Sequence, residues 1–168
     1  MKTYLGINID FGNVYYSVVD FNKGKASLQQ LGGFATSNSC IFSIKDEIPD
    51  IFMNETGMDL DAVIYTKQSY TDNEKPRRIA RYADIQTATL LGIEDAFHDE
   101  MLDVKKTGKF EYMGFEYEHI SSFYEEENMD MDNVFDETFD AEDFSVSYPQ
   151  QIASCLCLYY HKNHGKFA

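Results

Sequence analysis

The tetrapeptide Asp10-Phe11-Gly12-Asn13 is the first place in this sequence where residue types and spacing could do chemistry. A carboxylate at the tip of a hairpin can hold Mg²⁺ through water, and a glycine lets backbone N–H groups approach a phosphate because it has no Cβ. The same residues are also common in turns, since Asp and Gly tolerate the dihedral angles that turns need. The tetrapeptide alone therefore leaves a phosphate site and a simple turn as open interpretations.

A second candidate group lies near the C-terminus, where Cys155, Cys157, His161 and His164 supply soft ligands that would suit Zn²⁺. Their spacing does not match the common structural zinc motifs. Two cysteines two residues apart on a helix point in different directions, so we expect buried small apolar side chains there. With Cys40 the chain has an odd number of cysteines, which favours reduced thiols over a disulfide framework.

The third candidate is an acidic stretch. Of the 168 residues, 29 are acidic and 14 are basic, which gives a formal net charge of −15. Residues 91–150 hold 18 acids and 3 bases, a difference equal to the net charge of the whole chain. Carboxylates interleaved with Met and Phe predict a face for a basic partner protein, and the alternative is a device for solubility. The candidate partner-binding residues are Glu94, Asp95, Glu125, Glu126, Glu127, Asp130, Asp132, Asp136 and Glu137.

Several function classes have no support in the sequence. It contains no Gly-x-Ser-x-Gly, no Walker-type loop and no pairing typical of a Cys/His nucleophile. No apolar run approaches the roughly 18 residues of a membrane span, and no signal peptide is evident, so we predict a cytoplasmic protein without membrane contact. The acidic excess repels phosphate backbones, which predicts no direct binding of nucleic acid.

The elements that would position these residues begin with a predicted hairpin of strands at 3–9 and 14–21. A second turn at 22–25, a weakly alternating run and a short apolar run at 40–44 complete a predicted antiparallel meander. From Pro76 the apolar period becomes helical. The remaining predictions are helices from Pro76 to about residue 90 and over 93–103, a hairpin over 109–117, a helix opening at 119, a strand at 144–148 stopped by Pro149, and a helix at 152–160.

These elements predict an α+β fold with an antiparallel or mixed sheet, opened by the meander and packed with helices. The length suits a single domain, 1–168. We divide it into a β-rich part at 1–75, a helical acidic part at 76–143, and a strand with a C-terminal helix at 144–168.

Residues 6–21, GINIDFGNVYYSVVDF, resemble the first phosphate-binding hairpin of the actin-like ATPases, and their D-F-G core is most similar to the heat-shock chaperone ATPases. The segments 25–44, 115–127 and 144–151 look like the elements that follow in the first half of that lobe. The resemblance implies that Asp10 is a metal-side carboxylate and that Asp10, Gly12 and Asn13 form a cradle for ATP or ADP with Mg²⁺.

The sequence also departs from this family. Asn13 and Val14 replace the hydroxyl residues after the glycine, the catalytic lysine has no clear match, and the second phosphate loop and the adenosine segment are absent. Half a cleft cannot desolvate a phosphoryl transfer, so we do not expect autonomous ATPase activity.

Three hypotheses remain open at this point. The first is a non-catalytic binding module derived from the ATPase lobe. The second is an acidic inhibitor that imitates nucleic acid, similar in size and charge to phage anti-defence proteins. The third is a fragment of a longer ATPase. A homodimer is possible in each case, because a short sheet leaves an edge strand that a second copy could cover.

Overall fold

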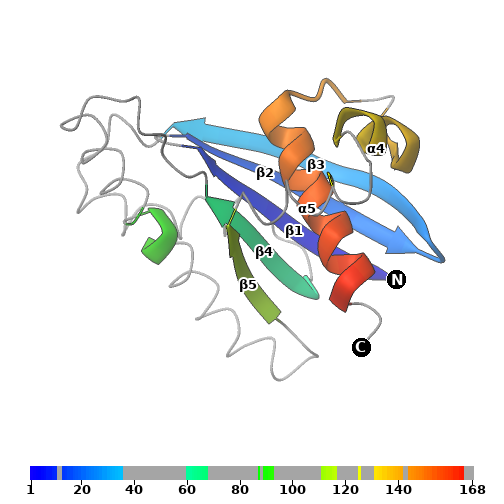
Figure 1. Ribbon diagram of the computed structural model, residues 1–168, viewed down its shortest axis with the longest axis horizontal. Coiled ribbons are helices and arrows are strands. Elements are labelled where there is room, and N and C mark those ends of the chain that lie inside the picture. The colour runs from blue at the N-terminus through cyan, green and yellow to red at the C-terminus, as the bar shows by residue number, and fades with distance from the viewer. Residues whose placement is uncertain are drawn as a thin grey trace.

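The computed structural model (Figure 1) describes residues 1–10, 13–35, 60–67, 87, 89–92, 111–116, 125, 131–141 and 144–164. The named elements in chain order are β1 (Lys2–Asp10), β2 (Asn13–Asn22), β3 (Lys25–Ala35), β4 (Ala62–Lys67), β5 (Glu111–Glu116), α4 (Met131–Thr138), β6 (Phe139–Asp140) and α5 (Tyr148–His164).

The strands form one mixed sheet in the order β5-β4-β1-β2-β3-β6. Strands β1, β2 and β3 pair antiparallel in chain order, which confirms the first three strands of the predicted meander. Strand β4 runs parallel to β1, and β5 runs parallel to β4. The carboxyl ends of β1, β4 and β5 therefore lie at the same edge of the sheet. The α+β class with a mixed sheet is confirmed.

Strand β1 lies in the middle of the sheet and is buried on both faces. Tyr4, Gly6 and Asn8 face α5, while Leu5, Ile7 and Ile9 point to the opposite face and are all 0% exposed. A strand that is covered on both sides has an almost continuous apolar sequence, as residues 4–9 of β1 do. A polar residue at such a position is therefore conspicuous.

Helix α5 begins at a defined N-terminal motif. The backbone N–H of Ser147 donates to Oε1 of Gln150 at 3.1 Å, which satisfies one of the free donors at the helix start. Pro149 is tolerated in the first turn because its missing N–H has no partner to lose there. This proline opens the helix, and the predicted strand at 144–148 is therefore wrong.

Helix α5 crosses the sheet over β1 and β2, with α4 beside it (Figure 1). It approaches β1 closely at Gly6, where an added Cβ would meet the carbonyl O of Ala153 and lie 2.7 Å from Sγ of Cys157. Two buried serines fix the helix on β2, because Oγ of Ser154 shares a 2.7 Å hydrogen bond with Oγ of Ser17. The apolar core on this face includes Tyr4, Val19, Phe21, Ile64, Val134, Phe135, Ile152 and Leu156.

Several predicted elements differ from the structure. The segment predicted as a hairpin at 109–117 contributes one strand, β5, that pairs parallel with β4. Helix α4 occupies part of the acidic segment, and the C-terminal helix starts four residues earlier than predicted. The predicted run at 40–44 and the helix at 93–103 lie outside the described residues. Among the residues that the structure does describe, no helix is long and apolar enough to cross a membrane.

Candidate functional site

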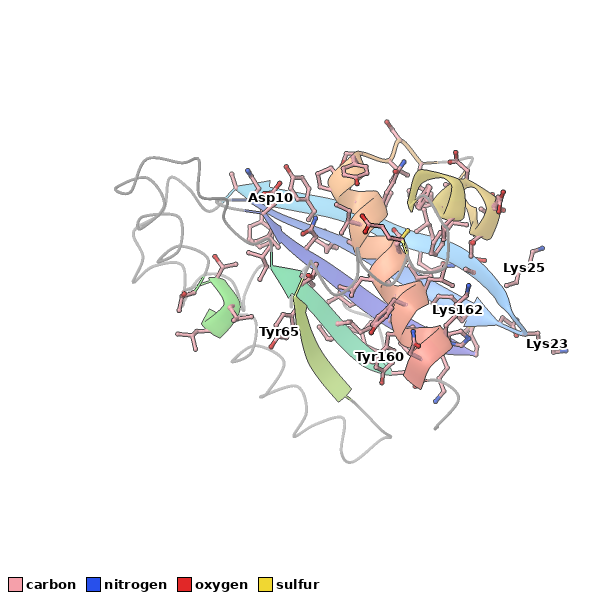
Figure 2. All side chains as sticks on the ribbon, viewed as in Figure 1. Asp10, Lys23, Lys25, Tyr65, Tyr160 and Lys162 are labelled. Atoms are coloured by element: carbon pink, nitrogen blue, oxygen red, sulfur yellow. The ribbon has the colours of Figure 1, made fainter. Side chains whose placement is uncertain are left out.

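The candidate site lies at the carboxyl end of β1, where Asp10 is the last residue of the strand (Figure 2). Asp10 is partly buried and its backbone pairs with Asn13 across the hairpin. Its Oδ1 atom is buried without a hydrogen-bond partner. Burial disfavours the charged form and raises the pKa of this carboxyl above its usual value. A carboxylate held in this way lacks a favourable partner for its negative charge.

Asn8 lies two residues earlier in β1 and is fully buried. Its Nδ2 donates to the carbonyl O of Pro149 in the first turn of α5, at 3.2 Å. This bond fixes the orientation of the amide, because the donor end must face the helix. The Oδ1 end of the amide is left without a hydrogen-bond partner.

Thr66 belongs to the neighbouring strand β4 and pairs in register with Asn8. Register partners in a parallel pair project their side chains to the same face, so Thr66 lies beside Asn8 on the α5 side of the sheet. Thr66 is 0% exposed, and its Oγ1 is also buried without a partner. Side chains alternate along a strand, which places Asp10 on this face as well.

Three side-chain oxygens therefore share one face at one edge of the sheet: Oδ1 of Asn8, Oδ1 of Asp10 and Oγ1 of Thr66. A buried polar atom without a partner carries a cost in free energy, so three at one place suggest a ligand. Hard oxygen atoms are the ligands that Mg²⁺ and Mn²⁺ prefer. The set fits such a cation in ligand type, with a single carboxylate.

The described residues contain no group of three or more His, Cys, Asp or Glu side chains placed to hold a metal ion. This applies to Cys155, Cys157 and His161 as well. Cys155 and Cys157 are fully buried reduced thiols, and burial raises the pKa of the Cys157 thiol. His161 instead stacks on Phe21, with ring centroids 4.2 Å apart, and its Nδ1 lies 3.2 Å from the hydroxyl O of Tyr4.

The sequence-predicted site residues fall in different places. Asn13 is exposed at the start of β2, and Gly12 lies outside the described part of the chain. In the acidic set, Glu125, Asp136 and Glu137 are exposed, which agrees with a solvated face. Asp132 belongs to α4. The other members, Glu94, Asp95, Glu126, Glu127 and Asp130, lie outside the described residues.

Sequence reasoning found Asp10 but missed Asn8 and Thr66. The signal for Asn8 was present, since it is a polar residue on the inward face of an otherwise apolar strand. Thr66 carried no such signal. It becomes part of the site only because β4 pairs parallel with β1, and that pairing is a long-range feature.

No protein-family model matches the sequence, and no curated protein matches it. The fold nevertheless has clear structural neighbours. Thermus thermophilus RuvC in complex with a Holliday junction substrate is similar at TM-score 0.64 and 12% identity, covering 99% of this chain and 96% of that chain. A second Thermus thermophilus RuvC structure gives TM-score 0.59 at 14% identity, covering 97% and 96%. The yeast mitochondrial Holliday junction resolvase Ydc2 gives 0.57 at 11%, covering 94% and 75%.

These comparisons correct the resemblance drawn from residues 6–21. The structural neighbours are RuvC-like resolvases and not actin-like or chaperone ATPase lobes, so the hypothesis of an ATPase-derived binding module is wrong. The D-x-G hairpin misled because a carboxylate at the end of a first strand, followed by an antiparallel partner, does not specify one fold. The prediction of nucleotide binding depended on that resemblance and is contradicted together with it.

The comparisons also contradict the predicted absence of nucleic acid and the alternative of an acidic inhibitor. That prediction used net charge, which reports on the whole surface, whereas a cation at a local site can join a carboxylate to a phosphate. The neighbour at TM-score 0.64 was solved with its Holliday junction substrate. This chain thus has the fold of the RuvC-like Holliday junction resolvases.

Proposed function

We propose a nuclease-like function for this chain: it recognises branched DNA, and the sheet edge at Asp10 is where a divalent cation and a phosphodiester group meet. The observation that carries the proposal is the RuvC-like fold, which extends over 99% of this chain and 96% of a RuvC chain solved with a Holliday junction. The unpartnered oxygens at the same edge support the location.

The residues of the site have distinct roles in this proposal. Asp10 supplies the negative charge that holds the cation, and its partial burial keeps that charge poorly solvated until a cation is present. Asn8 and Thr66 supply neutral oxygens from fully buried positions, and α5 fixes Asn8 through the Pro149 carbonyl. When bound, the cation would act as a Lewis acid on a phosphoryl oxygen.

The charge of the protein makes the cation necessary for recognition. With a net charge of −15, the chain as a whole repels a phosphate backbone. Screening by salt removes part of that repulsion, but a divalent cation at Asp10 converts it locally into attraction. We therefore expect DNA binding to require a divalent cation, and to be lost in EDTA.

The test is a fluorescence-anisotropy titration of a labelled four-way junction and a linear duplex with the same arm sequences. It is run in Mg²⁺, Mn²⁺, Ca²⁺ and EDTA, and the Mg²⁺ and Mn²⁺ samples are then analysed for strand cleavage. We expect preference for the junction, dependence on the cation, and loss of both in Asp10→Asn. The matched control is Asp136→Asn, which removes an exposed carboxylate on α4.

Three outcomes bear directly on the proposal. Equal affinity for junction and duplex would refute the recognition of branched DNA. Binding that is unchanged in EDTA, or in Asp10→Asn, would refute the location of the site. Cleavage in Mn²⁺ that Asp10→Asn abolishes would support both parts together.

A further inference from the structure

We infer that the oxygens of Asn8, Asp10 and Thr66 form a charge-poor site for a single hard divalent cation, and that the neutral amide of Asn8 keeps the affinity of this site low. The inference concerns the site on which the proposed function rests. It is tested without DNA, so the two can fail separately.

The first step is the number of charges. Affinity for hard cations increases with the number of anionic ligands and with the rigidity of the site. Among the side chains described at this edge, Asp10 is the carboxylate, while Asn8 and Thr66 contribute neutral oxygens. A site with one negative charge has a dissociation constant of roughly 10⁻⁴ to 10⁻³ M or weaker, the range of weak calcium modules.

The second step is the reason why residue 8 is an amide. Its Nδ2 group donates to the carbonyl O of Pro149 at 3.2 Å, in a fully buried position. A carboxylate at this position would place an oxygen against that carbonyl, with no proton to share. The two acceptors would repel each other unless a cation drew the carboxylate toward Asp10. The hydrogen bond to the Pro149 carbonyl therefore favours the neutral asparagine over an aspartate at residue 8.

The third step is that the oxygens remain available. Oδ1 of Asn8 and Oγ1 of Thr66 are buried and have no hydrogen-bond partner, although both residues are 0% exposed. Native proteins seldom leave such atoms unsatisfied without a bound water or ion. A hydrated divalent cation satisfies both atoms and at the same time neutralises Asp10.

The experiment is an isothermal titration of the folded chain with Mn²⁺ and Mg²⁺ in the absence of DNA, together with thermal melts at increasing Mn²⁺. Asn8→Asp adds one carboxylate, and we expect its dissociation constant for Mn²⁺ to fall at least about tenfold. Its melting temperature should rise with Mn²⁺ by clearly more than that of the unaltered chain, because a ligand that binds only the folded state stabilises it.

The matched control is Asn163→Asp. Asn163 also donates its Nδ2 to a carbonyl, that of Tyr159, at 2.8 Å, but it lies near the other end of α5. This variant makes the same chemical change and loses the same kind of hydrogen bond. We expect its Mn²⁺ affinity to equal that of the unaltered chain.

If Asn8→Asp folds only when Mn²⁺ is added, the inference is supported, because the added carboxylate then makes folding depend on the bound cation. If it does not fold at all, Thr66→Asp adds the carboxylate from the neighbouring strand and should tighten Mn²⁺ binding in the same way. Micromolar binding by the unaltered chain would overturn the inference, since further carboxylates would then have to reach the site. If neither Asn8→Asp nor Thr66→Asp binds Mn²⁺ more tightly than the unaltered chain, the inference is overturned as well.

Discussion

At the scale of single residues, the buried polar groups beside the first half of α5 differ in whether they have hydrogen-bond partners. Ser17 and Ser154 satisfy each other at 2.7 Å, and Ser154 also lies 2.9 Å from the carbonyl O of Gln150. Asn8 and Asp10 leave oxygens unsatisfied near the start of the same helix. Unsatisfied buried groups cost stability, and departures of this kind are expected at functional or strained sites.

The first prediction concerns Asp10. Its raised pKa means that the folded chain binds this proton more tightly than the unfolded chain does. The stability of the unaltered chain therefore falls as pH rises from below about 4 through that raised pKa. Asp10→Asn has no charge to desolvate, and we expect its melting temperature at pH 7, without metal, to be higher by roughly 2–4 °C.

The measurement is a series of calorimetric melts between pH 3 and pH 8 in EDTA. The difference between Asp10→Asn and the unaltered chain should disappear toward pH 3, where the carboxyl is protonated in both states. Asp136→Asn, on the exposed face of α4, should show no such pattern. A lower melting temperature of Asp10→Asn at pH 7 would mean that the charge is stabilised in the fold by a partner.

At the scale of elements, the turn between β2 and β3 carries a local strain that can be relieved. Lys23 has φ of 52° and Gly24 has φ of 80°, which are the two positive values that a two-residue hairpin of type I′ needs. Glycine adopts this conformation without strain, whereas lysine does not. Asparagine is the favoured residue at the first of these positions.

We therefore expect Lys23→Asn to stabilise the chain, by about 0.5–1 kcal/mol. Urea unfolding would measure this as a shift of the midpoint without a change in slope. Lys25→Asn, just beyond the turn, is the control for the loss of a lysine and should give no gain. Equal effects of the two changes would show that charge, and not backbone conformation, is responsible.

The contact of α5 with β1 yields a further prediction. An added Cβ at Gly6 would meet the carbonyl O of Ala153, which is backbone and cannot turn away, and would lie 2.7 Å from Sγ of Cys157. Gly6→Ala should therefore push the helix off the strand and cost about 1–3 kcal/mol in the free energy of unfolding. The double variant Gly6→Ala/Cys157→Ala removes the sulfur and should recover only part of the lost free energy of unfolding, because the clash with the Ala153 carbonyl remains. Unchanged stability in Gly6→Ala would show that the helix shifts freely.

The elements also show where sequence reasoning succeeded and where it failed. Alternation and turn residues located β1, β2 and the turn at 22–25, because these features are local. Pro149 was ambiguous, since proline ends strands and also opens helices, and only the Ser147–Gln150 bond distinguishes the two cases. The pairing of β5 with β4 and of β4 with β1 joins distant segments, and no local pattern encodes it. For the same reason Asp10 could be proposed from sequence and Thr66 could not.

At the scale of the whole molecule, three exposed lysines lie away from the candidate site. Lys23, Lys25 and Lys162 are exposed and lie at the end of the sheet opposite Asp10 (Figure 2). The stacking of Phe21 on His161 holds the end of β2 against the end of α5, which brings these lysines to one region. The length of β1, nine residues, separates the two ends by about 25–30 Å, which is shorter than the roughly 34–36 Å of one turn of B-DNA.

Under the proposed function, the end of the sheet that carries these lysines would contact the phosphates of a DNA duplex arm. Another part of the same arm would lie at Asp10. We expect Lys25→Gln/Lys162→Gln to weaken junction binding and to reduce the slope of log affinity against log salt by about 2. Anisotropy titrations at several salt concentrations measure both quantities. Lys2→Gln is the control, because Lys2 already pairs with Asp61 at 3.8 Å. An unchanged slope would exclude this end from the DNA interface.

The position of α5 in the chain has a consequence for how the protein is made. This helix, at residues 148–164, supplies the cover for the α5 face of β1, which begins at residue 2. During translation the three-stranded meander therefore leaves the ribosome long before its apolar face can be buried. Such contacts between segments far apart in a chain form slowly and leave nascent strands prone to association. Synthesis of this protein should therefore depend on cellular chaperones until α5 has been released.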